Sequence, residues 1–541
     1  MCGFVCLWRV PDEQLAERMI GRIAHRGPDQ LTVYRPERVP AVLAHCRLAI
    51  IGPADGRQPL EADDTVLVAN GEIYNHADLR AILGKGAFET ASDSETILHL
   101  FRSDRLRWLS RLDGMFAFVL ATPERVIAAR DPLGIKPLYV ARVGGGLAFA
   151  SELKAFDGIG AEVIEAVPPG GLFDSRDGER QWFRLTPGAA EPEPRFDIDA
   201  VAAELRLVLE EAVAKWMVAD VEVGSFLSGG LDSSIIAAVA AQSLARQPGK
   251  PRLKTFSVGL PGSPDLLAAR RVADHIGSEH FHLEFSAADL AAALPQVIYH
   301  LESADVDLVR SAVPTHFATT VARRQVKAVL TGEGADELFA GYAYHHDYAD
   351  RPRELADELT RSLRSMHNIN LQRVDRITMA QGLEARTPFL DRDLIDFAQT
   401  IPASVKLFVS PEQTSAPSPA GTESHLRPVG PEPTSASSPA GTESHIRPRG
   451  RTTIEKWILR KAVEDLLPAD LVWRKKAQFD EGTGTVDVLQ EALAIASGRA
   501  GPFSREDEAA IYEQILREQF TDPDMILAQA GTWADDRVEC G

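Results

Sequence analysis

The 541-residue chain contains little cysteine and has a deficit of positive charge. Its four cysteines are too few for a disulfide framework, and no two of them have the C-x-x-C spacing of structural zinc sites. Lys and Arg total 58 against 78 Asp and Glu, which gives a formal net charge of −20. An acidic chain of this kind repels nucleic-acid phosphates. We therefore expect no nucleic-acid partner.

Long hydrophobic runs are also missing. No apolar stretch reaches the roughly 18 residues of a membrane span, and the first residues do not have the pattern of a signal peptide. Together with the scarce cysteines, this favours a cytoplasmic protein with no membrane partner. The hydrophobic fraction of 45% and the charged fraction of 25% are typical of globular domains.

Three regions differ in pattern. Residues 1–185 contain short β-type runs such as TVLVAN and FAFVLAT, separated by turn residues. A stretch rich in Pro, Ala and Glu at 186–197 is typical of a linker. From 198 to 541, helical segments alternate with short apolar runs such as KTFSVGL, which indicates an α/β domain with a mainly parallel sheet.

One segment of the third region fits neither domain. Residues 411–430 and 431–450 form a direct repeat rich in Pro, Ser, Thr and Gly, and large apolar residues are nearly absent from it. Such a composition buries too little surface to offset the entropy of ordering. We expect a disordered and dispensable insertion at 409–451.

The stretch SFLSGGLDSSIIAAV at 225–239 joins an apolar run to a helix through two glycines, serines and an acid. A helix that begins directly after a strand presents unpaired N–H groups that bind anions, and glycines let the backbone approach a ligand. Asp232 could hold a Mg²⁺ ion that accompanies a phosphate chain. The pattern predicts a phosphate-binding loop over Ser228–Ser234.

The N-terminal sequence MCGFVC places Cys2 directly after Met1. Removal of Met1 would give Cys2 a free α-amine, whose pKa of about 8 allows it to take the proton of its own thiol. Cys2 is therefore a candidate nucleophile.

The motifs that follow supply a pocket for this nucleophile. Asn70 and the N–H of Gly71 could form an oxyanion hole. Arg47 could bind an α-carboxylate through its forked guanidinium, and Glu72 and Asp93 could hold an α-ammonium group. These groups together describe a site for a free amino acid that carries a cleavable amide.

The whole chain resembles the glutamine-hydrolysing asparagine synthetases, and its first 185 residues resemble their class II glutamine amidotransferase domain. Any one of the matching motifs is weak evidence, but their order and spacing across two domains are specific. They read SGGLDSS (228–234), FSVGLPGSPDL (256–266), LTGEGADELFAGY (330–342), MAQGLEARTPFLD (379–391), EKWILRKA (455–462) and VWRKKAQFDEG (472–482).

The resemblance implies an α+β N-terminal nucleophile hydrolase sandwich followed by an α/β doubly wound ATP-pyrophosphatase domain. It also implies two linked reactions. Cys2 releases ammonia from glutamine through a thioester, and ATP activates aspartate as β-aspartyl-AMP, which ammonia attacks to give asparagine, AMP and pyrophosphate. ATP, Mg²⁺, glutamine and aspartate are the implied ligands, and a homodimer is the family's usual assembly.

The resemblance assigns further residues to the second site. Glu333 would take a proton from attacking ammonia, Arg310 would stabilise phosphate or transition-state charge, and Lys476 would stabilise the leaving pyrophosphate. Asp232 and Asp336 would share Mg²⁺. The expected ATP contacts are Leu227, Ser228, Gly229, Gly230, Leu231, Asp232, Ser233, Ser234, Val258, Thr331 and Gly332.

The chain departs from the family near Arg310. Ala304 replaces an aromatic residue, and Asp307 and Leu308 replace paired threonines. An acid at 307 would disfavour a second carboxylate if it pointed inward. A related amidotransferase with a different carboxylate acceptor is therefore the main alternative. A β-lactam-synthetase-like ring closure and a non-catalytic binding protein are less favoured, because the glutaminase residues and the phosphate loop are intact.

Overall fold

The computed structural model describes residues 2–103, 108–190, 196–247, 249–409, 453–474, 482–529 and 531. Lys476 and the repeat at 411–450 lie outside these residues, so the predictions made for them stay predictions. In the described part of the chain, no helix is both long enough and apolar enough to cross a membrane.

The N-terminal region is a sandwich of two six-stranded antiparallel sheets, with strand orders β10-β8-β9-β1-β3-β2 and β12-β11-β7-β6-β5-β4. The strands of the first sheet are β1 (Cys2–Trp8), β2 (Gln30–Tyr34), β3 (Ala41–Arg47), β8 (Tyr139–Val143), β9 (Gly146–Ala150) and β10 (Ile164–Ala166). Those of the second are β4 (Leu60–Ala62), β5 (Thr65–Ile73), β6 (Gly114–Ala121), β7 (Val126–Arg130), β11 (Gly171–Asp174) and β12 (Gly178–Gln181).

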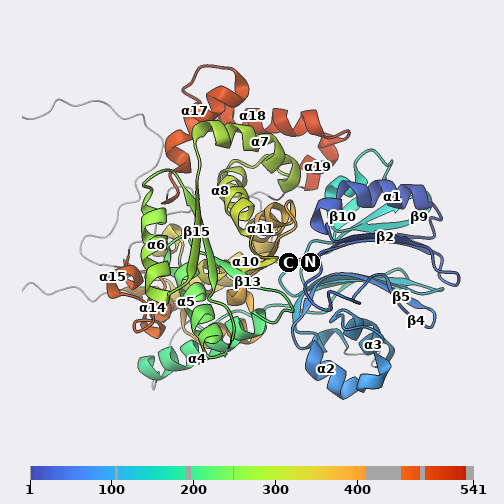
Figure 1. Ribbon diagram of the computed structural model, residues 1–541, viewed down its shortest axis with the longest axis horizontal. Coiled ribbons are helices and arrows are strands. Elements are labelled where there is room, and N and C mark those ends of the chain that lie inside the picture. Colours follow the sequence, from blue (N-terminus) through green and yellow to red (C-terminus); the bar gives the residue numbers. More distant parts are fainter. Residues whose placement is uncertain are drawn as a thin grey trace, which may run out of the picture.

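Helices cover both outer faces of the sandwich (Figure 1). They are α1 (Glu13–Arg22) on the first sheet, and α2 (His76–Leu83) and α3 (Glu95–Ser103) on the second. Every residue of β1 is buried. Phe4 of β1 lies in the core between the sheets, whereas Val5 and Leu7 belong to the core under α1. A strand buried on both faces needs a nearly continuous apolar run, which is what this segment has.

The C-terminal region is built on a five-stranded parallel sheet of order β15-β14-β13-β16-β17. Its strands are β13 (Val223–Phe226), β14 (Lys254–Gly259), β15 (Glu279–Glu284), β16 (Ala328–Leu330) and β17 (Glu384–Arg386). The first four helices are α4 (Ile198–Trp216), α5 (Leu231–Ala245), α6 (Pro264–Ile276) and α7 (Ala287–Leu301). The others are α8 (Val306–Ala322), α9 (Ala335–Phe339), α10 (Pro352–Ser365), α11 (Asn370–Met379), α12 (Arg392–Thr400), α13 (Ala403–Lys406), α14 (Trp457–Ala462), α15 (Ala469–Val472), α17 (Thr485–Ser497), α18 (Arg505–Gln519) and α19 (Pro523–Gln529).

The strand order reverses between β13 and β16, which places the topological switch point of the sheet there. In open parallel sheets, ligands bind outside the carboxyl ends of the strands at this point. The loops that leave β13 and β16 carry the SGGLDSS and TGEGADE motifs. The fold class expected from the sequence is confirmed, and the fold brings these two motifs to the same edge of the sheet.

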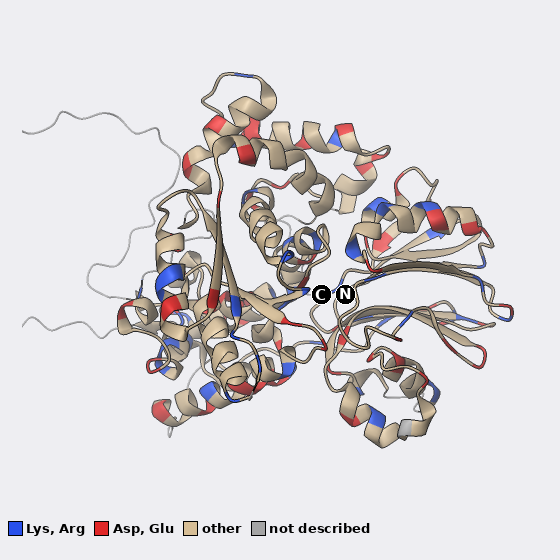
Figure 2. Cartoon of the chain, viewed as in Figure 1, with Lys and Arg blue, Asp and Glu red and all other residues tan. Residues whose placement is uncertain are grey.

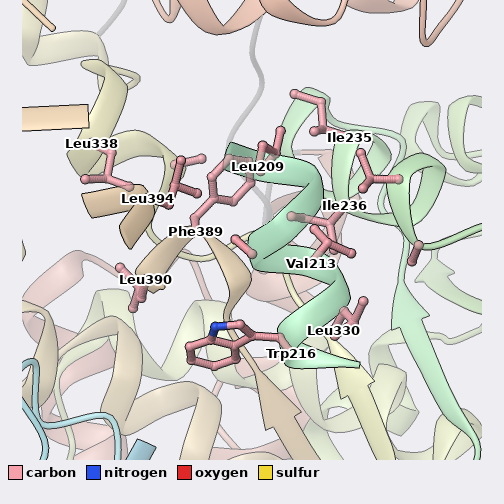
Figure 3. Packing of buried hydrophobic residues seen from close by; sticks show 14 of the residues in the cluster. Leu209, Val213, Trp216, Ile235, Ile236, Leu330, Leu338, Phe389, Leu390 and Leu394 are labelled. Atoms are coloured by element: carbon pink, nitrogen blue, oxygen red, sulfur yellow. The ribbon is translucent and has the colours of Figure 1, made fainter. Parts of the chain in front are cut away.

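Helix α4 packs on a large apolar core. Figure 3 shows Trp216 and Val213 of α4 in one buried cluster with Ile236 of α5 and Leu390. The Trp216 indole N–H donates to Asp391 Oδ2 over 2.8 Å, so its polar atom is satisfied inside the core. This packing fixes α4 and the segment that follows it.

The two domains meet through buried charges. Arg26 of the sandwich is fully buried and pairs with Glu152 at 2.5 Å and with Asp375 of α11 at 2.8 Å. Lys154 pairs with Glu302 of the second domain at 2.9 Å. Figure 2 shows acidic and basic segments interspersed over both domains. Breaking such buried pairs is costly, since the remaining charge stays out of water.

A small two-stranded sheet closes the base of the predicted insertion. Phe408 and Val409 form β18, which pairs with β19 (Thr453–Ile454) in antiparallel register. Val409 thus belongs to this sheet. The chain therefore leaves for the insertion and returns from it at neighbouring points.

Candidate active sites

Cys2 is the first residue of β1, and it lies opposite Arg47 of β3. Its backbone N–H donates to Asn70 Oδ1 over 3.0 Å. Burial raises the pKa of the Cys2 thiol, although the nearby amino-terminal charge and the Leu48 N–H act in the opposite direction. After removal of Met1, the nitrogen that contacts Asn70 would be the α-amine of Cys2.

Asn70 and Gly71 lie on β5, in the sheet that faces β1. Asn70 is fully buried, and its Nδ2 has no hydrogen-bond partner in the described part of the chain. A buried unpaired amide donor is costly unless a ligand uses it. Gly71 has φ +146°, and a Cβ there would stand 2.0 Å from Met115 O, so only glycine fits. The unpaired amide group of Asn70 thus lies on the side chain that contacts the Cys2 nitrogen, and the oxyanion hole predicted at Asn70 and Gly71 stays a prediction.

Glu72 and Asp93 bring two buried carboxyl groups to the same pocket. Burial raises the pKa of Glu72 well above its ordinary value, and the carboxylates of Glu384 and Asp93 add to the rise. Burial also raises the pKa of Asp93, which accepts the Ile73 N–H over 2.7 Å. A bound cation between these carboxyl groups would relieve the cost of their charge. The arrangement fits an α-ammonium group.

Arg47 is occupied by its own loop. Its guanidinium donates to the carbonyl oxygens of Gly52 over 2.6 Å, Pro53 over 3.2 Å and Ile51 over 3.3 Å. A Cβ at Gly56 would stand 2.6 Å from Arg47 Nη2, so this glycine leaves room for the side chain. Arg47 and this loop thus hold each other in place beside the nucleophile, and the α-carboxylate contact predicted for Arg47 stays a prediction.

In the second domain, the loop from β13 to α5 is ordered by its own serines. The hydroxyl groups of Ser228 and Ser233 lie 3.0 Å apart, and Ser228 N–H donates to Ser233 Oγ over 3.2 Å. Ser234 Oγ donates to Gly230 O over 2.7 Å. Gly229 has φ +77°, and a Cβ there would stand 2.5 Å from Ala269 N. These bonds hold the loop in one shape, and α5 begins directly behind it.

The TGEGADE loop lies directly against this one. A Cβ at Gly332 would stand 2.9 Å from both Asp232 Cβ and Ser233 N. Thr331 N–H donates to Arg386 O over 2.8 Å, which extends the pairing of β16 with β17. Leu227 and Val258 are buried beside these loops at the ends of β13 and β14.

Lys456 stands between the two predicted metal ligands. Its Nζ lies 2.6 Å from both oxygens of Asp232 and 2.6 Å from Asp336 Oδ1. Burial alone would lower the pKa of Lys456, but the two carboxylates raise it above its ordinary value. A Cβ at Gly341 would stand 2.1 Å from Lys456 Cε, so glycine is required beside the lysine. The site therefore has its own fixed cation.

Glu333 is also paired. Its Oε1 accepts from Arg373 Nη2 over 2.5 Å, and Arg373 Nη1 donates to Thr315 Oγ1 over 3.3 Å. Arg373 lies on α11, two residues before the Asp375 that binds Arg26. This ion pair holds the Glu333 carboxylate against α11.

Arg310 and Asp307 both contact α18. Arg310 forms a forked pair with Glu508, with contacts of 2.9 and 2.5 Å. Asp307 pairs with Arg505 over 3.0 and 2.6 Å, and both side chains are 57% exposed. Asp307 thus points to the surface. An acid at this position disfavours a second carboxylate of the acceptor only if it points inward, so Asp307 gives no reason to doubt aspartate as the acceptor.

The fold brings Asn70, Glu72 and Asp93 near Cys2, and it brings the SGGLDSS and TGEGADE loops together around Asp232. Arg310 instead pairs with Glu508 of α18, and Lys476 lies outside the described residues. The sequence reasoning missed Lys456 and Arg373, although both lie in quoted or neighbouring motifs. Among the described residues, no cluster of three or more His, Cys, Asp or Glu side chains could hold a metal ion. A metal at Asp232 and Asp336 would need further oxygen ligands from a bound phosphate chain.

Comparisons with known proteins give a consistent result. A family model described as asparagine synthase matches residues 204–357 and 349–537, and one described as glutamine amidotransferase domain matches residues 1–165. Asparagine synthetase [glutamine-hydrolyzing] 2 of Arabidopsis thaliana is 38% identical over 505 residues, which cover 90% of this chain and 79% of that protein. The enzyme of that name from Lotus japonicus is 36% identical over 552 residues, covering 96% of this chain and 86% of that protein. A solved glutamine phosphoribosylpyrophosphate amidotransferase from B. subtilis superposes with a TM-score of 0.31 at 23% identity, over 46% of this chain and 65% of that one.

Proposed function

The chain belongs to the asparagine synthetase family, and we propose that the two groups of residues described above divide its reaction between them. The enzyme amidates aspartate to asparagine, with ATP as the source of energy and glutamine as the source of ammonia. The single observation that carries the assignment of residues is the pair of loops at the switch point, where Asp232, Asp336 and Lys456 converge.

In the first site, glutamine binds with its α-ammonium group between Glu72 and Asp93. Cys2 attacks the side-chain amide carbon, and its thiol proton passes to its own α-amine. The oxyanion that forms accepts hydrogen bonds from Asn70 Nδ2 and from the Gly71 N–H. The α-ammonium of Cys2 then returns this proton to the amide nitrogen, ammonia leaves, and water hydrolyses the remaining thioester to glutamate.

In the second site, the SGGLDSS loop binds the phosphates of ATP at the start of α5. The β-carboxylate of aspartate attacks the α-phosphorus, and the bond to pyrophosphate breaks. Lys456 holds a positive charge beside the phosphates and keeps Asp232 and Asp336 in place. Mg²⁺, bound by these two carboxylates and the phosphate oxygens, would neutralise further charge on the leaving group. Lys476 is proposed to stabilise the leaving pyrophosphate as well.

Ammonia then attacks the activated β-carbonyl carbon, and AMP leaves. Glu333, held by Arg373, is positioned to accept the proton that ammonia must lose. Arg310 is proposed to stabilise transition-state charge only if it exchanges Glu508 for substrate, because its guanidinium is already paired.

We also propose a cytoplasmic homodimer. Its support is the family resemblance together with the exposed edge strand β2, where Leu31 is 53% exposed. Sedimentation analysis would test the assembly.

The function is tested by incubating the protein with ATP, Mg²⁺, aspartate and glutamine and measuring asparagine, AMP and pyrophosphate. Equal amounts of the three products support the assignment. Glutamate release without asparagine would indicate another carboxylate acceptor.

A further inference from the structure

The loop that contains the partners of Arg47, residues 48–53, is held from outside its own domain. This glutamine loop lies directly after β3, and Leu48 N–H faces the Cys2 thiol. Gly52 has φ +58°, and a Cβ there would stand 3.0 Å from Ala91 C and 3.1 Å from Ser92 N. The loop therefore touches both the nucleophile and the segment that leads into Asp93.

The outside contact comes from Asp220, in the segment between α4 and β13 of the synthetase domain. Gly52 N–H donates to Asp220 Oδ2 over 2.9 Å. Asp220 N–H in turn donates to Ile50 O over 3.2 Å. The two bonds form a reciprocal pair between residues 168 positions apart in the chain. A carboxylate acceptor makes the first bond stronger than a neutral one would be.

A second contact holds the start of the same loop. Ala49 N–H donates to Asp29 Oδ2 over 2.7 Å. Lys327, directly before β16, places its Nζ 2.7 Å from the same oxygen. The synthetase domain thus contacts the glutamine loop at both Gly52 and, through Asp29, Ala49.

The segment that carries Asp220 is itself fixed to the synthetase site. Arg386 of β17 donates from Nη1 to Trp216 O over 2.7 Å and to Val218 O over 2.8 Å. The carbonyl oxygen of Arg386 accepts the Thr331 N–H of the TGEGADE loop over 2.8 Å. Hydrogen bonds of Arg386, together with the backbone from Val218 to Asp220, therefore connect the synthetase loop to the glutamine loop.

From these contacts we propose that Asp220 is a positioning residue for glutamine. This proposal rests on the proposed function of the first site. Asp220 holds residues 50–52 in the form in which their carbonyl oxygens fix Arg47, and so it sets the affinity of the glutaminase site from the other domain. It touches neither the thiol nor the amide, and so it acts on glutamine binding and leaves the chemical step unchanged.

The test compares D220A with D220N in the full-length enzyme. Asp220 is exposed at the surface, so neither substitution disturbs a core. Asn retains an oxygen that can accept the Gly52 N–H, whereas Ala does not. We expect D220A to raise the KM for glutamine about fivefold, which corresponds to about 1 kcal/mol, with kcat for glutamate release unchanged. D220N should lie close to the wild type.

The matched control is Q529A, which removes another hydrogen bond between the domains, from Gln529 Nε2 to Ile164 O at 2.8 Å. It should leave the KM for glutamine unchanged. K327A should raise that KM less than D220A does, because Asp29 still accepts the Ala49 N–H. Asparagine synthesis from ammonium chloride should be the same in all of these variants.

An unchanged KM in D220A would overturn the proposal, and so would an equal rise in Q529A. Loss of ammonia-dependent synthesis in D220A would also overturn it, since that result indicates general damage to the synthetase domain. Failure of the wild type itself to hydrolyse glutamine would instead refute the proposed function.

Discussion

Replacing Lys456 with methionine should separate the two reactions. Methionine keeps the length and apolar stem of the side chain and removes only the ammonium group. In the wild type, that group makes contacts of 2.6 Å with Asp232 and Asp336. Without it, two carboxylates face each other and the incoming phosphates with no fixed cation between them.

The size of the effect follows from these contacts. A hydrogen bond to a charged group contributes about 1.5–3 kcal/mol. The two carboxylates are each 20% exposed, and solvent reduces the loss toward the lower end of the range. Losing two such interactions costs about 3 kcal/mol in the transition state, or about a hundredfold in the rate of pyrophosphate release. Glutamate release should not change, because Cys2 lies in the other domain.

The assay measures pyrophosphate release with ATP, Mg²⁺ and aspartate, and glutamate release in the same preparation. K461M is the control, since Lys461 lies on α14, which begins directly after Lys456, and its ion pair in the described part of the chain is with Glu464 at 3.1 Å, near the surface. Pyrophosphate release by K456M at the rate of K461M would refute the reasoning. Loss of both activities would show that Lys456 supports the fold and would equally contradict a role confined to the synthetase site.

Three further changes test other parts of the account. N70A should reduce kcat for glutamate release by about a hundredfold or more by removing one oxyanion donor, while synthesis from ammonium chloride continues; a loss below threefold would contradict the oxyanion role. Burial lowers the pKa of His280 to about 4, below its value of about 6.5 in the unfolded chain, so the unfolded state binds the extra proton and stability falls as the pH drops from 6.5 to 4. Because the ring is partly exposed, the loss of stability over this range is about 2 kcal/mol. H280Q should therefore show a smaller fall of Tm between pH 6.5 and 4 than the wild type. Identical pH profiles of the two proteins would refute this role of His280. Deleting residues 411–450 shortens the connection between the paired strands β18 and β19 and removes about 2 kcal/mol of loop-closure cost. Tm and both activities should therefore be retained. Loss of either would show that the repeat is required.

Much of the fold could be predicted from the sequence, because local patterns determine it. The alternating short strands of the first 185 residues and the strand-helix alternation after 198 each indicate one class of sheet. The SGGLDSS motif identified its own loop, since a glycine-rich turn before a helix has few other uses.

The contacts between distant segments could not be predicted in this way. Lys456 reaches Asp232 across 224 positions, and no local pattern in EKWILRKA indicates its partner. The direction of the Asp307 side chain could not be predicted either, because acids occur at the same spacing on the exposed face of a helix and on a face that lines a site. Only the position of α18 shows that Arg505 binds this side chain at the surface.

The most direct test of the central claim uses glutamine labelled with ¹⁵N in its side-chain amide. The enzyme is incubated with this glutamine, ATP, Mg²⁺ and aspartate, and the products are analysed by mass spectrometry. We expect asparagine that carries ¹⁵N in its amide, formed in equal amount to AMP, pyrophosphate and glutamate. Release of ¹⁵N-labelled ammonia from glutamine without labelled asparagine would contradict the claim that the two sites together amidate aspartate.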